Sequence, residues 1–183
     1  MELNLECFDV FPVLKTDRLT LREIRKEDAD AIFRMRSNRN VNRFISRPDM
    51  QDPSTALDLA ERTISAWKER KAIGWAGVLR DQGAIVGTCG FNAIDFYNLR
   101  AEIGGELDVE HWGKHIALEA VEAIVRYGFE VMRLHSIEAK VSPANRGAIA
   151  LMEHLGFKKE AHFRDRIFFN GVFSDMAVYT AIR

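Results

Sequence analysis

The sequence has little of three things that commonly indicate function: cysteine, net charge and long apolar runs. The two cysteines among 183 residues, Cys7 and Cys89, could form at most one bridge and make no redox or zinc motif, so we expect free thiols. The formal net charge is −1, so no overall field attracts nucleic acid or a membrane surface. No apolar run approaches the roughly 18 residues of a membrane span, and the acidic N-terminus lacks a signal-peptide pattern. We therefore expect a cytoplasmic protein with neither nucleic acid nor membrane as a partner.

Sequence motifs for several enzyme chemistries are also missing. The chain has no G-x-G-x-x-G after a strand, no G-x-x-x-x-G-K-[ST], no H-E-x-x-H and no G-x-S-x-G, which argues against dinucleotide-binding, P-loop, zinc-protease and hydrolase functions. His111 and His115 are four residues apart, but Trp112 and Gly113 disfavour a continuous helix there, and no third ligand is evident. We therefore expect no metal cofactor.

What the chain does contain is a strand that runs through a glycine-bearing turn into an amphipathic helix, between Glu102 and Ala120. Backbone N–H groups at a helix start have no intrahelical partners and lie at the positive end of the helix dipole, so they suit phosphate. The turn alone, however, is better interpreted as an ordinary helix start.

Periodicity and turn signals predict one α/β (α+β) domain over residues 1–183, in which residues 1–17 form an N-terminal arm. Strand patterns cover about 19–24, 73–80, 84–91, 100–109, 135–141, 157–169 and 172–182. Helical patterns cover about 26–36 and 54–67, a segment through 119–130, and 145–155. Asn170-Gly171 is a strong hairpin signal between the last two strands.

Arginine dominates the segment after the first predicted helix. No acidic residue stands between Asp30 and Asp49, and the run consists of Arg34, Arg36, Arg39, Arg43 and Arg47. Charge runs are usually solvated faces, which is the interpretation that we favour here. The alternative is a surface for an anionic substrate or for the ribosome, whose binding would be sensitive to salt.

In their order and spacing, several segments resemble the GNAT superfamily of acyl-CoA-dependent N-acetyltransferases, specifically its Rim-type branch, which acts on the N-termini of ribosomal proteins. The resemblance spans nearly the whole chain and rests on Leu14–Arg22, Ile85–Gly90, Ala101–Gly104 with Leu107 and Asp108, Trp112–Ala120, Asn145–Phe157, Gly171 and Asp175. It implies a GNAT-like single domain with a mixed, mostly antiparallel sheet of about seven strands, about four flanking helices and splayed central strands.

The same resemblance implies acetyl-CoA as cosubstrate, with its pyrophosphate on the turn and its pantetheine arm beside the splayed strand. The positions that correspond to this site are Leu107, Val109, Trp112, Gly113, Lys114, His115, Ile116, Ala117 and Asn145. His115 stands where the family has glycine, which lets backbone and phosphate approach closely. Its side chain either obstructs that approach or, if the residue is helical, leaves the amide in place and adds charge.

Transfer to an amine requires an uncharged nucleophile, a stabilised oxyanion and a departing thiolate. The resemblance implies Glu102 as the base and a backbone N–H near Leu107 as the oxyanion donor. Glu106 lies on the same strand face, but roughly 13 Å further along, too far for a paired-carboxylate dyad. Because the branch commonly has an aromatic residue at that position, we expect Glu106 to shape the acceptor pocket instead.

The proton donor for the thiolate is left open by the sequence. The branch has a serine where this chain has Ala148, so water, Ser142 or Asn145 remains for this role, and no match places Tyr127 or Tyr179 in it. The expected function is acetyl transfer to a primary amine, a protein N-terminus or a small amine, by direct attack in a ternary complex. A CoA-binding regulatory or interaction module with little turnover is the alternative, and the chain is expected to be a monomer or a homodimer.

Overall fold

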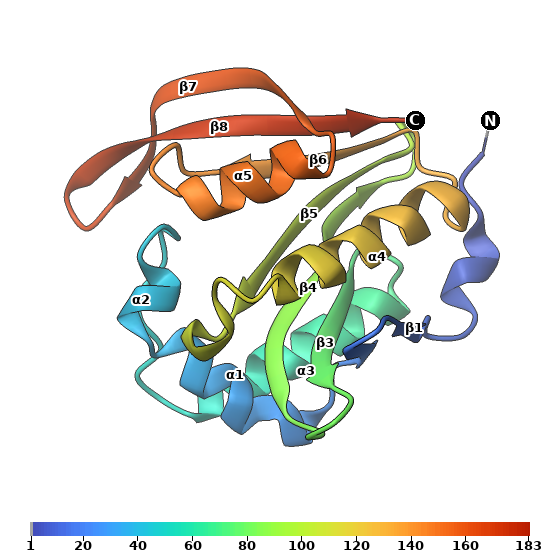
Figure 1. Cartoon of the computed structure of the whole chain (residues 1–183), viewed down its shortest axis with the longest axis horizontal. Helices are drawn as coiled ribbons and strands as arrows, with labels where there is room; N and C mark the ends of the chain where they lie inside the picture. Colours follow the sequence, from blue (N-terminus) through green and yellow to red (C-terminus); the bar gives the residue numbers. More distant parts are fainter. Residues whose placement is uncertain (1) are drawn as a thin grey trace.

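The computed structural model describes residues 2–183, so Met1 of the expected arm lies outside the described residues. These residues form one eight-stranded sheet in the order β1-β2-β3-β4-β5-β6-β8-β7 (Figure 1). The strands are β1 (Leu14–Lys15), β2 (Leu19–Glu23), β3 (Ile73–Leu79), β4 (Ile85–Asp95), β5 (Arg100–Leu107), β6 (Ser136–Val141), β7 (Lys158–Phe169) and β8 (Val172–Ile182). All neighbouring strands are antiparallel except β5 and β6.

Five α-helices and three short 3₁₀ helices accompany the sheet. They are η1 (Leu5–Phe8), η2 (Lys26–Asp28), α1 (Ala29–Arg36), α2 (Arg39–Asn42), α3 (Ser54–Lys68), η3 (Val109–His111), α4 (Ile116–Glu130) and α5 (Arg146–His154). The predicted mixed sheet and flanking helices are confirmed, and the short elements β1 and α2 are additions to them. No helix within residues 2–183 is both long enough and apolar enough to cross a membrane.

Local sequence explains two of the hairpins, β7–β8 and β3–β4. Asn170 and Gly171 both have positive φ, 49° and 78°, which matches the right-handed twist of the strands that a two-residue turn joins. Gly83, with φ of 67°, lies in the turn between β3 and β4. The strand patterns and the turn residues therefore predicted these pairings correctly.

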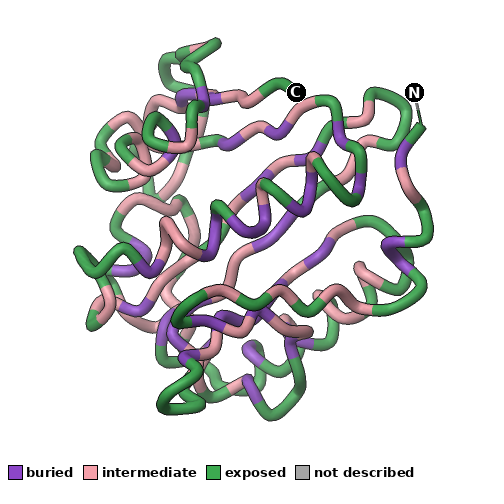
Figure 2. The backbone as a smooth tube through the Cα atoms, turned by 45° about the vertical axis from the view of Figure 1, so that its right-hand side comes forward, coloured by how far each residue is buried: buried purple, intermediate pink, exposed green. Residues whose placement is uncertain are grey.

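The sheet is covered on both faces. On one face α4 and α5 pack over a core that contains Trp75, Phe91 and Ile124, all completely buried. On the other face α1 and α3 enclose a smaller cluster around Ile32 and Ala60. Figure 1 shows α4 in front of the strands and α3 behind them, and Figure 2 shows buried and exposed positions alternating along the helices.

The segment before β2 lies against the α4 side of the molecule. Leu3, Cys7 and Phe8 are buried in the larger core. The Trp75 indole N–H donates to the Pro12 carbonyl at 2.7 Å, and the Asn4 amide donates to the Met132 carbonyl at 3.0 Å. These contacts tie the segment to β3 and to the end of α4.

Strands β5 and β6 separate in the middle of the sheet. Their parallel pairing is confined to three residues of each strand, Arg100–Glu102 against Ser136–Glu138. From Ile103 to Leu107, β5 pairs only with β4, while the remainder of β6 pairs only with β8. The two strands meet near the C-terminus and diverge toward α2 (Figure 1). The predicted splayed strands are therefore confirmed, and one edge of β5 is left without a partner strand.

Candidate active site

The turn before α4 presents a row of free backbone donors. Within the described residues, the N–H groups of residues 113–118 donate no hydrogen bond. Gly113 has φ of 71°, which a glycine adopts without strain. The Asp108 carboxylate accepts from the Glu110 amide, and the Trp112 indole N–H donates to the Leu107 carbonyl at 2.9 Å, so both ends of η3 are held. This geometry suits an anion at the positive end of a 15-residue helix.

The segment between β1 and β2 braces this turn. The Arg18 guanidinium donates to the Lys114 carbonyl at 2.9 Å and to the Glu119 carboxylate at 2.7 Å. Glu119 also accepts from the Thr16 hydroxyl and from the Arg18 amide. Burial alone would raise the pKa of Glu119, but these hydrogen bonds outweigh it, and the pKa lies below its ordinary value. A charged carboxylate is thereby held in the first turn of α4, where the helix dipole favours it.

His115 precedes α4 in a left-handed conformation, with φ of 60° and ψ of 16°. The right-handed helical geometry considered above is therefore wrong for this residue. The backbone already has the shape that favours glycine, at a strain of about 1–2 kcal/mol for a residue with a side chain. The side chain itself is exposed. His115 thus keeps the glycine-like turn of the family without a glycine.

Glu102 occupies the last position at which β5 pairs with β6. Its Oε2 atom lies 2.5 Å from the Lys140 ammonium, which is also 3.6 Å from Glu138. The hydrogen bond to Glu102 is the main reason why the pKa of Lys140 is raised. The other carboxylate oxygen of Glu102 has no partner within residues 2–183, and the side chain is 25% exposed. Glu102 is therefore a charged group with one oxygen still available.

Glu106 has a different environment, although it lies on the same strand. Its side chain is only 3% exposed and accepts from Arg36 at 2.8 Å and from Arg47 at 2.5 Å. The Thr88 hydroxyl is 3.4 Å away. Glu106 thus joins α1 and the segment after α2 to β5, and has no free oxygen with which to accept a proton.

These ion pairs correct the interpretation of the arginine run as a solvated face. Arg36 and Arg47 are largely buried on Glu106, and Arg34 reaches Asp108 at 3.2 Å. Arg39 and Arg43 do lie on the surface, as that interpretation predicts. The carboxylate partners follow Arg34, Arg36 and Arg47 by 59 to 74 residues, so no local pattern could have indicated them.

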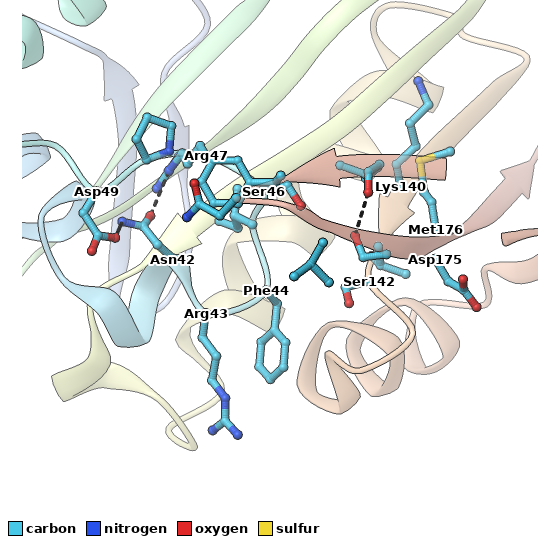
Figure 3. Close-up of a pocket in the computed structure, with 18 of the residues that line it drawn as sticks. Asn42, Arg43, Phe44, Ser46, Arg47, Asp49, Lys140, Ser142, Asp175 and Met176 are labelled. Atoms are coloured by element: carbon cyan, nitrogen blue, oxygen red, sulfur yellow. Dashed lines mark hydrogen bonds between the residues drawn. The ribbon is translucent and has the colours of Figure 1, made fainter. Parts of the chain in front are cut away.

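A cavity of about 550 Å³ lies between the segment 39–49 and the outer strands β6, β7 and β8. Figure 3 shows Asn42, Arg47 and Asp49 on one side, and Lys140, Ser142 and Asp175 on the other. Asn42 links its neighbours, because its amide accepts from Arg47 and donates to Asp49. Glu102 itself does not line the cavity, but its ion-pair partner Lys140 does.

Comparison with known proteins decides the family. The family model for the acetyltransferase (GNAT) domain matches residues 18–158. The chain belongs to the GNAT acetyltransferase family. It is 36% identical over 174 residues to the uncharacterized N-acetyltransferase YoaA of Bacillus subtilis, covering 95% of this chain and 98% of that protein. It is 37% identical over 170 residues to the uncharacterized N-acetyltransferase p20 of Bacillus licheniformis, covering 93% and 96%.

Other members of the GNAT family are more distant in sequence but share the fold. The ribosomal L7/L12 alpha-N-protein acetyltransferase RimL, solved with coenzyme A, superposes with a TM-score of 0.85 at 20% identity, covering 93% of this chain and 96% of that chain. Two relatives at 26% identity are the spermidine N(1)-acetyltransferase of Vibrio cholerae, covering 87% and 90%, and the ribosomal protein uS5-alanine N-acetyltransferase of Escherichia coli, covering 88% and 86%. The protein is thus an N-acetyltransferase with Rim-type relatives.

Among the candidate proton donors of this N-acetyltransferase, Ser142 lines the cavity. Asn145 caps α5, because its side-chain oxygen accepts from the Ala148 amide at 3.1 Å. Tyr127 is buried and donates to the Cys7 carbonyl, and burial raises the pKa of its hydroxyl. That hydroxyl therefore contacts the N-terminal segment and not the cavity. Tyr179 is buried in β8.

Sequence reasoning missed the residues that support the GNAT site from a distance. Lys140 follows Glu102 by 38 residues, and Arg18 precedes Lys114 by 96. Lys140 belongs to no motif, and Arg18 lies within the Leu14–Arg22 segment of the resemblance, which gave it no role. The one usable signal was the arginine run, because an uncompensated stretch of that length requires carboxylates elsewhere in the chain if part of it is buried.

Proposed function

We propose that this enzyme transfers the acetyl group of acetyl-CoA to a primary amine by direct attack in a ternary complex. The observation that carries the proposal is the free edge of β5. It runs from the available carboxylate of Glu102 to the turn whose N–H groups at residues 113–118 have no partner. A ligand with an anionic end and a long polar arm could satisfy both the helix start and the unpaired strand edge.

In this arrangement the N–H groups of residues 113–118 bind the pyrophosphate, and the edge from Ile103 to Leu107 binds the pantetheine arm. That edge spans roughly 17 Å at about 3.3 Å per residue. Gly113 has no side chain and no neighbouring atom on the side where a Cβ would lie, so the backbone there can approach the phosphate closely. Asn145 caps α5 and follows Val141, the last residue of β6, by four residues.

Glu102 acts as the base, directly or through a water molecule. An α-amino group has a pKa of about 8, so most of it is protonated at neutral pH and must lose a proton before it attacks. The amine nitrogen then bonds to the thioester carbon, and a backbone N–H near Leu107 stabilises the oxyanion. The carbon–sulfur bond breaks as the intermediate collapses, and the thiolate leaves with its electron pair. A thiol has a pKa near 8.5, so Ser142 or water suffices to protonate it.

The acceptor is a protein N-terminus or a small amine. Relatives at 26% identity carry names of both kinds, one for an alanine of a ribosomal protein and one for spermidine. The cavity between segment 39–49 and the outer strands is open enough for either class and adjoins Lys140 and Glu102.

The test is release of free thiol from acetyl-CoA in the presence of a panel of peptides and small amines, together with mass spectrometry of the acceptor. We expect thiol release and a mass increase of one acetyl group in at least one amine. Tight binding of acetyl-CoA by calorimetry with no thiol release on any amine would instead support a regulatory CoA-binding module, the function that Ala148 in place of serine favours.

A further inference from the structure

The charges around the two ends of β5 do not balance. At Glu106, two guanidinium groups share one carboxylate, because Arg36 and Arg47 both bind it. Around Glu102, three carboxylates share two cations, because Lys140 contacts Glu102 and Glu138 while Arg100 contacts Glu138 and Asp95. Asp49, another carboxylate near Arg47, is already bound to Arg39 and Asn42. The Glu106 end therefore retains a positive charge and the Glu102 end a negative charge.

The excess positive charge lies where water reaches it poorly. The side chains of Arg36 and Arg47 are 25% and 20% exposed, and that of Glu106 is 3% exposed. Burial lowers the pKa of Arg47 even though Glu106 is beside it. Desolvated charges in proteins are normally paired, so an uncompensated one favours an anion from outside the chain.

Arg47 has a free donor with which to bind such an anion. Its Nε donates to the Asn42 side chain at 2.8 Å, and one Nη donates to Glu106. The other Nη has no acceptor within residues 2–183, and Arg47 lines the 550 Å³ cavity. Lys140, which forms an ion pair with Glu102, lines the same cavity from the opposite side (Figure 3).

We propose that the acceptor is an amine that also carries a carboxylate or a phosphate, and that Arg47 binds this anionic group while the amine lies toward Glu102. The proposal deepens the proposed function and rests on it. A planar guanidinium with free N–H donors suits either anion. Arg43, which lines the same cavity and stacks on Phe44, adds charge of the same sign. The cavity lining carries four cationic side chains against the two carboxylates of Asp49 and Asp175, so the second cation of a polyamine meets a net positive surface, and a polyamine is a poor acceptor.

Matched acceptors test the charge requirement. The peptide amides Ala-Asp-Phe and Ala-Asn-Phe differ by one carboxylate, and phosphoethanolamine and ethanolamine differ by one phosphate. We expect kcat/KM to be at least about tenfold higher for the charged member of a pair, since a charge-assisted hydrogen bond is typically worth that much or more. The pair with the larger ratio identifies the anion, and spermidine should be the poorest substrate.

Variants test whether Arg47 is the residue that selects charged acceptors over neutral ones. Arg47→Gln leaves Glu106 paired with Arg36, so no buried charge is orphaned, and urea unfolding should confirm that the variant is folded. We expect it to remove the preference within a pair while the KM for acetyl-CoA is unchanged, and Arg47→Lys to restore part of the preference. Arg62→Gln is the matched control, because Arg62 is an exposed arginine on α3 that does not line the cavity.

Equal use of charged and neutral acceptors, preference for spermidine, or an equal loss on both members of a pair in Arg47→Gln would overturn the proposal. Calorimetry of the same peptides with CoA present gives a readout that does not need turnover. Preferential binding of the charged peptide without any acetylation would overturn the proposed function but support the anion site. Acetylation of charged and neutral acceptors at equal rates would support the proposed function but overturn the anion site.

Discussion

Glu102 and Glu106 are the same residue type on the same strand, yet the structure uses them differently. Glu106 is buried and saturated by two arginines, whereas Glu102 is partly exposed, bound to one lysine, and keeps one oxygen free. The difference follows from the splay. At the Glu102 end, β5 still pairs with β6, and Lys140 of β6 binds the carboxylate. At the Glu106 end, β6 has diverged, and Arg36 of α1 and Arg47 of the segment after α2 bind the carboxylate instead.

In the proposed mechanism, Glu106 makes β5 rigid and Glu102 makes it reactive. A base must keep an oxygen for the proton that it accepts, and Glu106 has none to spare. Its ion pair with Arg47 instead fixes an arginine of the cavity lining relative to β5, the strand that carries Glu102. The predictions below test these two roles, beginning with the largest expected effect.

Replacement of Glu102 by glutamine should have the largest effect on activity. Loss of a general base lowers kcat by about a hundred- to ten-thousandfold, while the KM for acetyl-CoA should not change. The deficit should shrink between pH 7 and pH 9, because an amine with a pKa of about 8 then loses its proton unaided. Glu102 is the main cause of the raised pKa of Lys140 in the wild type, but an ordinary lysine also stays charged between pH 7 and pH 9, so Lys140 does not contribute to this profile in either protein.

Glu138→Gln is the matched control for the base. It removes the other carboxylate that contacts Lys140 but leaves Glu102 in place. We expect a loss of kcat below about tenfold, since no proton transfer is removed. Equal losses in the two variants would show that Glu102 contributes charge and not base catalysis.

Replacement of Glu106 by glutamine should have the largest effect on stability. It leaves the guanidinium groups of Arg36 and Arg47 side by side, largely buried and without a counter-ion. Breaking such a pair typically destabilises a protein by about 3 kcal/mol or more, which urea unfolding would measure. The double variant Glu106→Gln with Arg47→Gln should lose less than the single one, because one of the two orphaned charges is gone.

Glu110→Gln is the control for that measurement, because Glu110 is an exposed carboxylate in the turn that follows β5. Its free energy of unfolding should stay within about 0.5 kcal/mol of the wild type. An equally small change in the free energy of unfolding of Glu106→Gln would mean that solvent stabilises the two arginines. The ion pairs of Glu106 would then contribute little to stability.

Removal of the Arg18 side chain should weaken cofactor binding moderately. Arg18 holds the Lys114 carbonyl and Glu119, and so fixes the turn that continues from the Glu106 end of β5. We expect Arg18→Gln to raise the Kd for acetyl-CoA by about tenfold, since one or two hydrogen bonds of about 1 kcal/mol each position the N–H groups. Lys15→Gln, an exposed neighbour on β1, should leave the Kd unchanged. If Arg18→Gln changed only the KM for the acceptor, Arg18 would have no role in binding acetyl-CoA.

Much of this fold could be predicted from the sequence, because local signals determine it. Asn170 and Gly171 favour the positive φ angles of a two-residue turn, and the Asn145 side chain caps a helix by accepting from an amide three residues later. The structure confirms both. The roles of the arginines could not be predicted, since Arg47 and Glu106 are 59 residues apart and their proximity depends on the whole sheet. The left-handed backbone at His115 was indicated only by the resemblance, because the family has glycine at that position, and no local pattern in this chain predicted it.

Replacement of His115 by glycine should have the smallest effect. The backbone is already left-handed, so glycine relieves about 1–2 kcal/mol of strain, and its greater freedom in the unfolded chain offsets about 0.4–1 kcal/mol of that gain. The N–H groups of the turn stay in place, so the Kd for acetyl-CoA, measured by titration calorimetry, should change by less than about threefold. His115→Val also removes the imidazole but disfavours positive φ, and should weaken binding more than glycine does. A larger loss of affinity in His115→Gly would instead assign part of the phosphate binding to the His115 side chain.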